Sequence, residues 1–151
     1  MPTGLLKIVA AVFTVLVTKT LVEYASKKKV FVSFAIEDRK YRDLFVGQSV
    51  NSSTPFSFND MSVKEPWNSA WKTKCRKRIK SCNGVIVLLS ENALTASGVL
   101  WEVKCAIEED MPILIIFTGR KIGKKRLPEV FRGLKTNPWK WDVINEFLSN
   151  L

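Results

Sequence analysis

The absence of histidine limits the chemistry that this chain can perform. Its 151 residues include no histidine, which excludes Ser-His-Asp and Cys-His nucleophiles, histidine-ligated metals and imidazole proton transfer. The three cysteines are odd in number and have no paired base, so we interpret them as small apolar residues in a reducing compartment. Carboxylates, hydroxyls and lysines are the remaining candidates, and we expect no metal site.

Polar residues suited to such chemistry follow several short apolar runs. They form four segments, at 33–38, 60–67, 90–92 and 118–120. If the apolar runs are parallel strands, these segments lie at the carboxyl ends of the strands, where ligands bind in open α/β sheets. The sequence therefore predicts a site built from loops that are distant along the chain.

The elements that must position these loops alternate between strands and helices. Strand patterns cover 30–34, 56–58, 85–89 and 113–117, with a short edge strand expected at 138–141. Helical patterns cover 38–46, 71–82, 101–109 and 143–148. The runs 85–89 and 113–117 are apolar on both faces, which is typical of central strands covered by helices. We therefore expect a doubly wound, flavodoxin-like parallel α/β sheet.

The phosphate-binding loops of common nucleotide enzymes are missing. Neither G-x-G-x-x-G nor G-x-x-x-x-G-K-[ST] occurs, so Rossmann dehydrogenases and P-loop NTPases are not supported. A receiver domain needs an aspartate at the end of the central strand, but Leu89 is followed by Ser90 and Glu91.

Four stretches in register carry a resemblance to a known family. Three of them are strands with the residues that follow, at 30–34, 58–67 and 85–90. In the fourth, Glu102 lies within a helical pattern and precedes an aliphatic residue, and Pro112 soon leads into the next strand. Over residues 29–120 the chain thus resembles the TIR-like domain family, specifically the bacterial and archaeal branch that includes Thoeris defence proteins.

Two departures from the family pattern bear on function. In many TIR enzymes a tryptophan lies one helical turn before the glutamate, whereas here Trp101 directly precedes Glu102. The Arg-Asp-Pro-Gly loop of receptor adaptors is also absent, which argues against the signalling-adaptor branch.

The resemblance implies cleavage of the nicotinamide–ribose bond of NAD, with NAD as substrate and no separate cofactor. The product would be ADP-ribose or a cyclic or conjugated relative, made in antiphage defence. Nicotinamide leaves as a neutral ring, so departure needs no general acid, and one carboxylate can stabilise the cationic ribose. By its register with the family, Glu102 would be that carboxylate; the alternative is an exposed surface glutamate, like Glu108 and Glu109.

The resemblance also implies a set of substrate-binding residues. They are Ser33, Phe34, Glu37, Asp38, Asp60, Trp67 and Trp101. A structural alternative stays open for most of them: the aromatic residues could pack in the core, and Glu37 or Asp38 could cap the following helix.

A second hypothesis is a TIR-like interaction module that assembles through its helices and loops and has no turnover. Self-association is expected under both hypotheses. For an enzyme, the resemblance implies that the loop 60–67 of an adjacent copy completes the site.

The amino-terminal segment stands apart from the rest of the chain. Residues 5–22 are apolar apart from two lysines and three threonines, and Lys27–Lys29 follow. As a helix this run would be about 27 Å long, close to the roughly 30 Å of a bilayer core. We expect residues 1–26 to form a hydrophobic, membrane-spanning helix that holds a TIR-like domain, 27–151, in the cytoplasm. The alternative is a helix packed against protein in a soluble cytoplasmic molecule.

The net charge is +10, from 24 basic and 14 acidic residues. Basic side chains gather at 72–80 and 120–126, where anionic lipid, nucleic acid or acidic protein surfaces could bind. Aromatic residues are not interleaved with these clusters as base stacking would require, so we expect no nucleic-acid partner.

Overall fold

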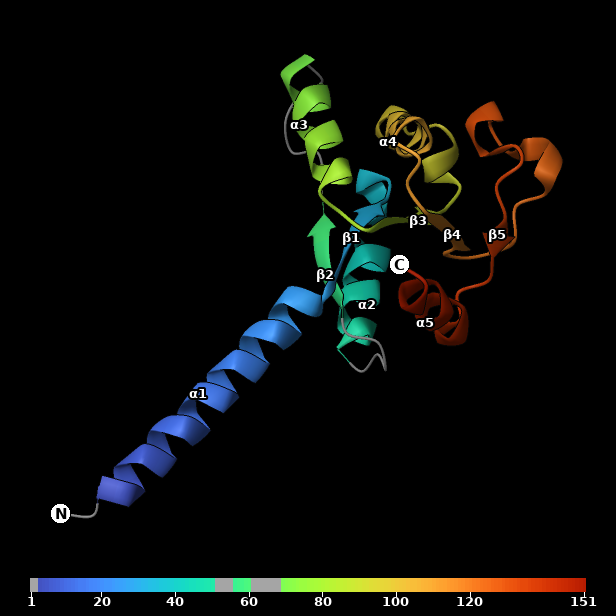
Figure 1. Cartoon of the computed structure of the whole chain (residues 1–151). Coiled ribbons are helices and arrows are strands. Elements are labelled where there is room, and N and C mark those ends of the chain that lie inside the picture. Colours follow the sequence, from blue (N-terminus) through green and yellow to red (C-terminus); the bar gives the residue numbers. More distant parts are fainter. Residues whose placement is uncertain (1–2, 51–55, 61–68) are drawn as a thin grey trace.

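A five-stranded parallel sheet forms the centre of the molecule in the computed structural model, which describes residues 3–50, 56–60 and 69–151 (Figure 1). The strands are β1 (Lys28–Ser33), β2 (Phe56–Asp60), β3 (Gly84–Leu89), β4 (Ile113–Phe117) and β5 (Thr136–Asn137). Their order is β2-β1-β3-β4-β5, with every neighbouring pair parallel. The predicted doubly wound α/β sheet is confirmed.

Helices cover both faces of this sheet (Figure 1). They are α2 (Arg39–Ser49), α3 (Ser69–Lys80), α4 (Ser97–Glu108) and α5 (Trp141–Ser149), with short 3-10 helices η1 (Ile36–Asp38), η2 (Asn92–Leu94), η3 (Lys124–Arg126) and η4 (Glu129–Phe131). Side chains alternate along a strand, so Phe31 and Val85 pack with α3 and α4 while Val30 and Ile86 pack with α2 and α5. All six residues of β3 are buried, as expected of a central strand.

The last strand lies earlier in the chain than predicted. An edge strand at 138–141 is wrong: β5 covers only Thr136–Asn137, which pair with Ile115 and Ile116 of β4. Pro138 has no N–H to continue the ladder. The two tryptophans beyond it instead donate their indole N–H groups to one acceptor on α2, Gln48 Oε1, at 3.0 Å from Trp139 and 2.8 Å from Trp141.

An amino-terminal helix, α1 (Thr3–Ser26), extends away from the sheet in Figure 1. The helix itself was predicted, and its large apolar side chains between Leu5 and Val17 are 40–77% exposed. The predicted membrane span is not supported, because no helix within the described residues is both long and apolar enough to cross a bilayer.

The strand pairing brings three loops to one edge of the sheet. Ser33 at the end of β1 lies beside Val87 of β3, and Leu89 at the end of β3 lies beside Phe117 of β4. The order places the switch in winding direction between β1 and β3, which is where open α/β sheets bind ligands.

Candidate functional site

A buried carboxyl group lies against the end of β1. Glu102 is on the inner side of α4, on the same helix face as Val99 and Ala106, and is only 3% exposed. Ser33 is the last residue of β1 and, like Phe31, points toward α3 and α4. Its hydroxyl donates a hydrogen bond to Oε2 of Glu102. The glutamate that the resemblance identified therefore contacts a strand end 69 residues away.

The apolar surroundings change the acidity of this carboxyl group. Burial raises the pKa of Glu102 to about 8, and the hydrogen bond from Ser33 opposes this only in part. Burial, and in second place the charge of Glu102, raise the pKa of the nearby Cys75 thiol. All three cysteines are buried, which agrees with their interpretation as small apolar residues. The raised pKa favours the protonated form of Glu102 in the free protein, and a nearby positive charge would favour its ionised form.

Trp101, the neighbour of Glu102, is held in the contact between α3 and α4. Its ring packs edge-on against Trp71, with centroids 5.3 Å apart. The guanidinium of Arg76 lies 5.7 Å from the Trp101 centroid and forms ion pairs with Glu108 at 2.7 Å and Glu109 at 2.5 Å. Trp101 therefore packs between Trp71 and Arg76, and its role in ligand stacking stays a prediction.

A second buried carboxyl group lies on the loop between β1 and α2. Asp38 is 3% exposed and accepts hydrogen bonds from the Ser90 hydroxyl and from Asn92 Nδ2, the latter at 2.9 Å. Ser90 Oγ in turn accepts the Ala93 backbone N–H at 3.0 Å. Asp38 precedes α2 but forms no side-chain cap on it, so the capping alternative is not realised. The carboxyl group joins the loop after β1 to the loop after β3.

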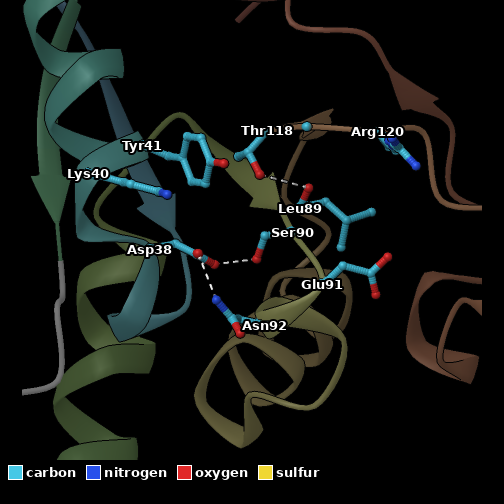
Figure 2. Close-up of a pocket in the computed structure, with 10 residues that line it drawn as sticks. Asp38, Lys40, Tyr41, Leu89, Ser90, Glu91, Asn92, Thr118 and Arg120 are labelled. Carbon is cyan, nitrogen blue, oxygen red and sulfur yellow. Dashed lines mark hydrogen bonds between the residues drawn. The ribbon is translucent and has the colours of Figure 1, made fainter.

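A cavity of about 330 Å³ opens above this second cluster (Figure 2). It is lined by residues that follow β1, β3 and β4, among them Asp38, Lys40, Ser90, Asn92, Gly119 and Arg120. Glu102 and Ser33 do not line it. The two carboxyl groups thus belong to different parts of the same sheet edge.

The remaining predicted residues are dispersed. Phe34 is 8% exposed and packs in the apolar cluster under α2 and α5. Glu37 is exposed on η1, and Asp60 ends β2 beside Val32. Trp67 lies outside the described residues. Their roles toward a substrate stay predictions.

Sequence reasoning did not assign Ser90 or Asn92 to the site, although both lie in a predicted strand-end segment. The signal was their position directly after β3. Strand β3 lies next to β1 in the sheet, and Asp38 lies in the segment that follows β1. In the part of the chain that the structure describes, no cluster of three or more metal-ligating side chains occurs.

Comparisons with known proteins agree with this architecture. Residues 31–121 match the family model described as "Thoeris protein ThsB, TIR-like domain". The fold is similar to the TIR domain of the Toll-related receptor TRR-2 from Hydra magnipapillata, with a TM-score of 0.52 and 16% identity over 80% of this chain and 92% of that one. It is also similar to a prokaryotic SEFIR domain, with a TM-score of 0.52 and 17% identity over 82% and 95%. No curated protein matches the sequence.

Proposed function

Because this chain belongs to the TIR-like domain family of Thoeris ThsB proteins, we propose that it cleaves the nicotinamide–ribose bond of NAD, with Glu102 as the catalytic carboxylate. The observation that carries the proposal is the buried pair of Glu102 and Ser33 at the carboxyl end of β1. Without such a role a glutamate at this position would only destabilise the fold, because burial opposes the charged form of an ionisable group.

The substrate itself supplies a positive charge that favours the ionised form of Glu102. The nicotinamide ring of NAD is a pyridinium cation, and a cation close to Glu102 lowers the pKa of the carboxyl group and releases its proton. The bond between the ribose carbon and the ring nitrogen then breaks, and its electron pair stays on the nitrogen. Nicotinamide leaves as a neutral ring, and the positive charge moves onto the ribose.

Glu102 acts on that ribose cation. An ionised carboxylate in an apolar setting stabilises developing positive charge more strongly than one in water. Water, a nucleophile within the substrate or a nucleophile of a second molecule then attacks the ribose carbon and gives up a proton. The product is ADP-ribose, a cyclic form or a conjugate, respectively. Ser33 is a positioning residue, because its hydroxyl holds one carboxylate oxygen of Glu102.

The proposal includes self-association and a role in antiphage defence, in line with the family. Self-association would raise turnover per molecule as the protein concentration increases, until the assembly is complete. A dilution series with nicotinamide release as the readout measures this. Turnover per molecule that is constant across the series would indicate a self-contained monomer.

The direct test is incubation of the purified chain with NAD, with nicotinamide and ADP-ribose products separated by chromatography and identified by mass. We expect nicotinamide to accumulate in equal amount to the NAD consumed. Heat-denatured protein is the control. A folded, assembled wild-type protein that releases no nicotinamide would reject the proposal in favour of the non-catalytic interaction module.

A further inference from the structure

The cavity beside Asp38 has the position of a ligand site. It lies at the carboxyl ends of β1, β3 and β4, across the point where the winding of the sheet reverses, and such crevices bind ligands in open α/β sheets. Its volume of about 330 Å³ is at the lower end of the range of roughly 300–1,000 Å³ found for ligand pockets. A sugar phosphate or a mononucleotide is of suitable size.

The floor of the cavity is built from hydrogen-bonded groups, of which Asp38 and Ser90 are buried. Figure 2 shows Asp38, Ser90 and Asn92 pointing toward one another at its base. Ser90 is also held by the Ala93 backbone N–H. Because these bonds join two loops, the floor is positioned before any ligand arrives, which lowers the entropic cost of binding.

Two cations flank this floor. Lys40 comes from the first turn of α2 and Arg120 from the loop after β4, and both are exposed. Within the described residues neither of them forms an ion pair, whereas the acid on the rim, Glu91, is bound by both terminal nitrogens of Arg126 at 2.8 and 2.6 Å. The amino-terminal end of α2 adds partial positive charge on the same side. Both acids of the lining are held by other side chains, Glu91 by Arg126 and Asp38 by Ser90 and Asn92. Lys40 and Arg120 are therefore the charged groups that an incoming anion can bind.

The loop after β4 also leaves room for a ligand to approach its main chain at Gly119. A Cβ atom added at Gly119 would have no atom within 4 Å, so the backbone here faces open space rather than a packed neighbour. Thr118 beside it is fixed by a hydroxyl hydrogen bond to the Leu89 carbonyl at 3.3 Å. A group that binds between Lys40 and Arg120 can thus reach the main chain of a positioned loop.

We infer that this cavity binds the phosphate group of a small molecule, held between Lys40 and Arg120 over the floor formed by Asp38, Ser90 and Asn92. The site is separate from Glu102, since neither Glu102 nor Ser33 lines the cavity. It does not depend on NAD cleavage, because phosphate binding is measurable whether or not the chain has turnover. A free phosphate ion and a phosphate ester share the chemistry that these side chains recognise.

Isothermal titration calorimetry of the full chain at constant ionic strength tests this inference. The probes are inorganic phosphate, ribose 5-phosphate and AMP, with ribose and adenosine as partners without phosphate. We expect saturable binding of the phosphate compounds only. Tighter binding of the esters would identify an ester as the ligand, and equal binding of inorganic phosphate would identify the free anion.

Two double variants remove the same charge from different places. Lys40→Gln with Arg120→Gln removes both flanking cations, and Arg39→Gln with Lys121→Gln removes their sequence neighbours, which are exposed and do not line the cavity. We expect the first pair to weaken phosphate binding at least roughly tenfold, the usual scale for losing hydrogen bonds to a charged group, and the second pair to change it less than threefold.

Three outcomes would overturn the inference. They are the absence of saturable binding by every phosphate probe, equal weakening by both double variants, and equal affinity for adenosine and AMP. Equal weakening would mean that phosphate is attracted only by the overall charge of +10. Melting temperatures of the variants establish that each one is folded.

Discussion

Glu102 and Asp38 are both 3% exposed, and each accepts a hydrogen bond from a serine hydroxyl, yet their surroundings differ. Glu102 has one donor, Ser33, and lies among apolar side chains, where burial raises its pKa to about 8. Asp38 has a second donor, Asn92, and borders a cavity with cations on its rim. Equal burial therefore does not mean equal surroundings: burial among apolar groups raises the pKa of Glu102, whereas Asp38 joins two loops through its hydrogen bonds.

Removing the charge of Glu102 should have the largest effect. Glu102→Gln preserves the size of the side chain and an oxygen that can accept the Ser33 hydrogen bond. Under the proposed mechanism it removes one preorganised electrostatic partner of the transition state, which typically costs ~3–4 kcal/mol, or roughly 100–1,000-fold in rate. Nicotinamide release is the measurement. Glu108→Gln, on the exposed side of the same helix, is the control and should keep most of the activity; full activity of Glu102→Gln would place the catalytic carboxylate elsewhere.

The same substitution should change how stability depends on pH. The folded pKa of Glu102 is about 8, against 4.5 for an ordinary glutamate, so between these values the folded protein binds more protons than the unfolded chain. The stabilising contribution of the protonated group is complete below about pH 4.5 and is lost as the pH rises to about 8.

One such group lowers the free energy of unfolding by about 1.4 kcal/mol per pH unit in this window, or about 2 kcal/mol between pH 5.5 and 7. Urea denaturation at both pH values measures this. We expect the wild type to lose about that much more stability than Glu102→Gln over the interval. Parallel pH dependence of the two proteins would show that Glu102 is ionised in the folded state throughout.

The pH profile of catalysis should report the same carboxyl group. If the ionised form is the active one, kcat/KM for NAD rises about tenfold per pH unit below pH 8 and levels off above it, since kcat/KM follows the ionisation of the free enzyme. Initial rates at low NAD concentration from pH 6 to 9 measure it. A flat profile, or one that falls as the pH rises, would contradict the assignment of Glu102 as an ionised carboxylate in catalysis.

The smallest effect is expected at Asp38. Asp38→Asn keeps the shape but leaves a single side-chain oxygen for the two donors, Ser90 and Asn92. Loss of one hydrogen bond of this kind costs about 1 kcal/mol, so the melting temperature should fall by a few degrees. Glu37→Gln, an exposed neighbour, serves as control. An unchanged melting temperature for Asp38→Asn would show that its two donors are as well satisfied without the carboxylate.

The central strands were predictable because their sequence pattern is strong. The run 113–117 coincides with β4, and 85–89 lacks only the first residue of β3, since two-faced apolar strands are fixed by burial. The edge strand was placed wrongly at 138–141, because a strand of two residues is defined by pairing with β4 rather than by its own pattern.

Of the candidate site, the sequence predicted the residues of one contact but not those of the other. The resemblance named both Ser33 and Glu102, which the fold joins. The partners of Asp38 were not foreseen, because a short polar side chain at a strand end can cap a helix, bind a ligand or join two loops. Which of these occurs depends on the distance to Ser90 and Asn92, and those residues lie more than fifty positions along the chain.

The double hydrogen bond at Gln48 has a consequence for how the molecule folds and opens. One side-chain carbonyl accepts from Trp139 and Trp141, 91 and 93 residues later in the chain, and Phe45 on the same helix stacks on Trp141 with centroids 5.5 Å apart. Helix α2 therefore gains these partners only when the last segment arrives, and contacts of such long range form slowly. In hydrogen exchange, α2 and α5 should then open together as one cooperative unit, ahead of the buried strands β1, β3 and β4.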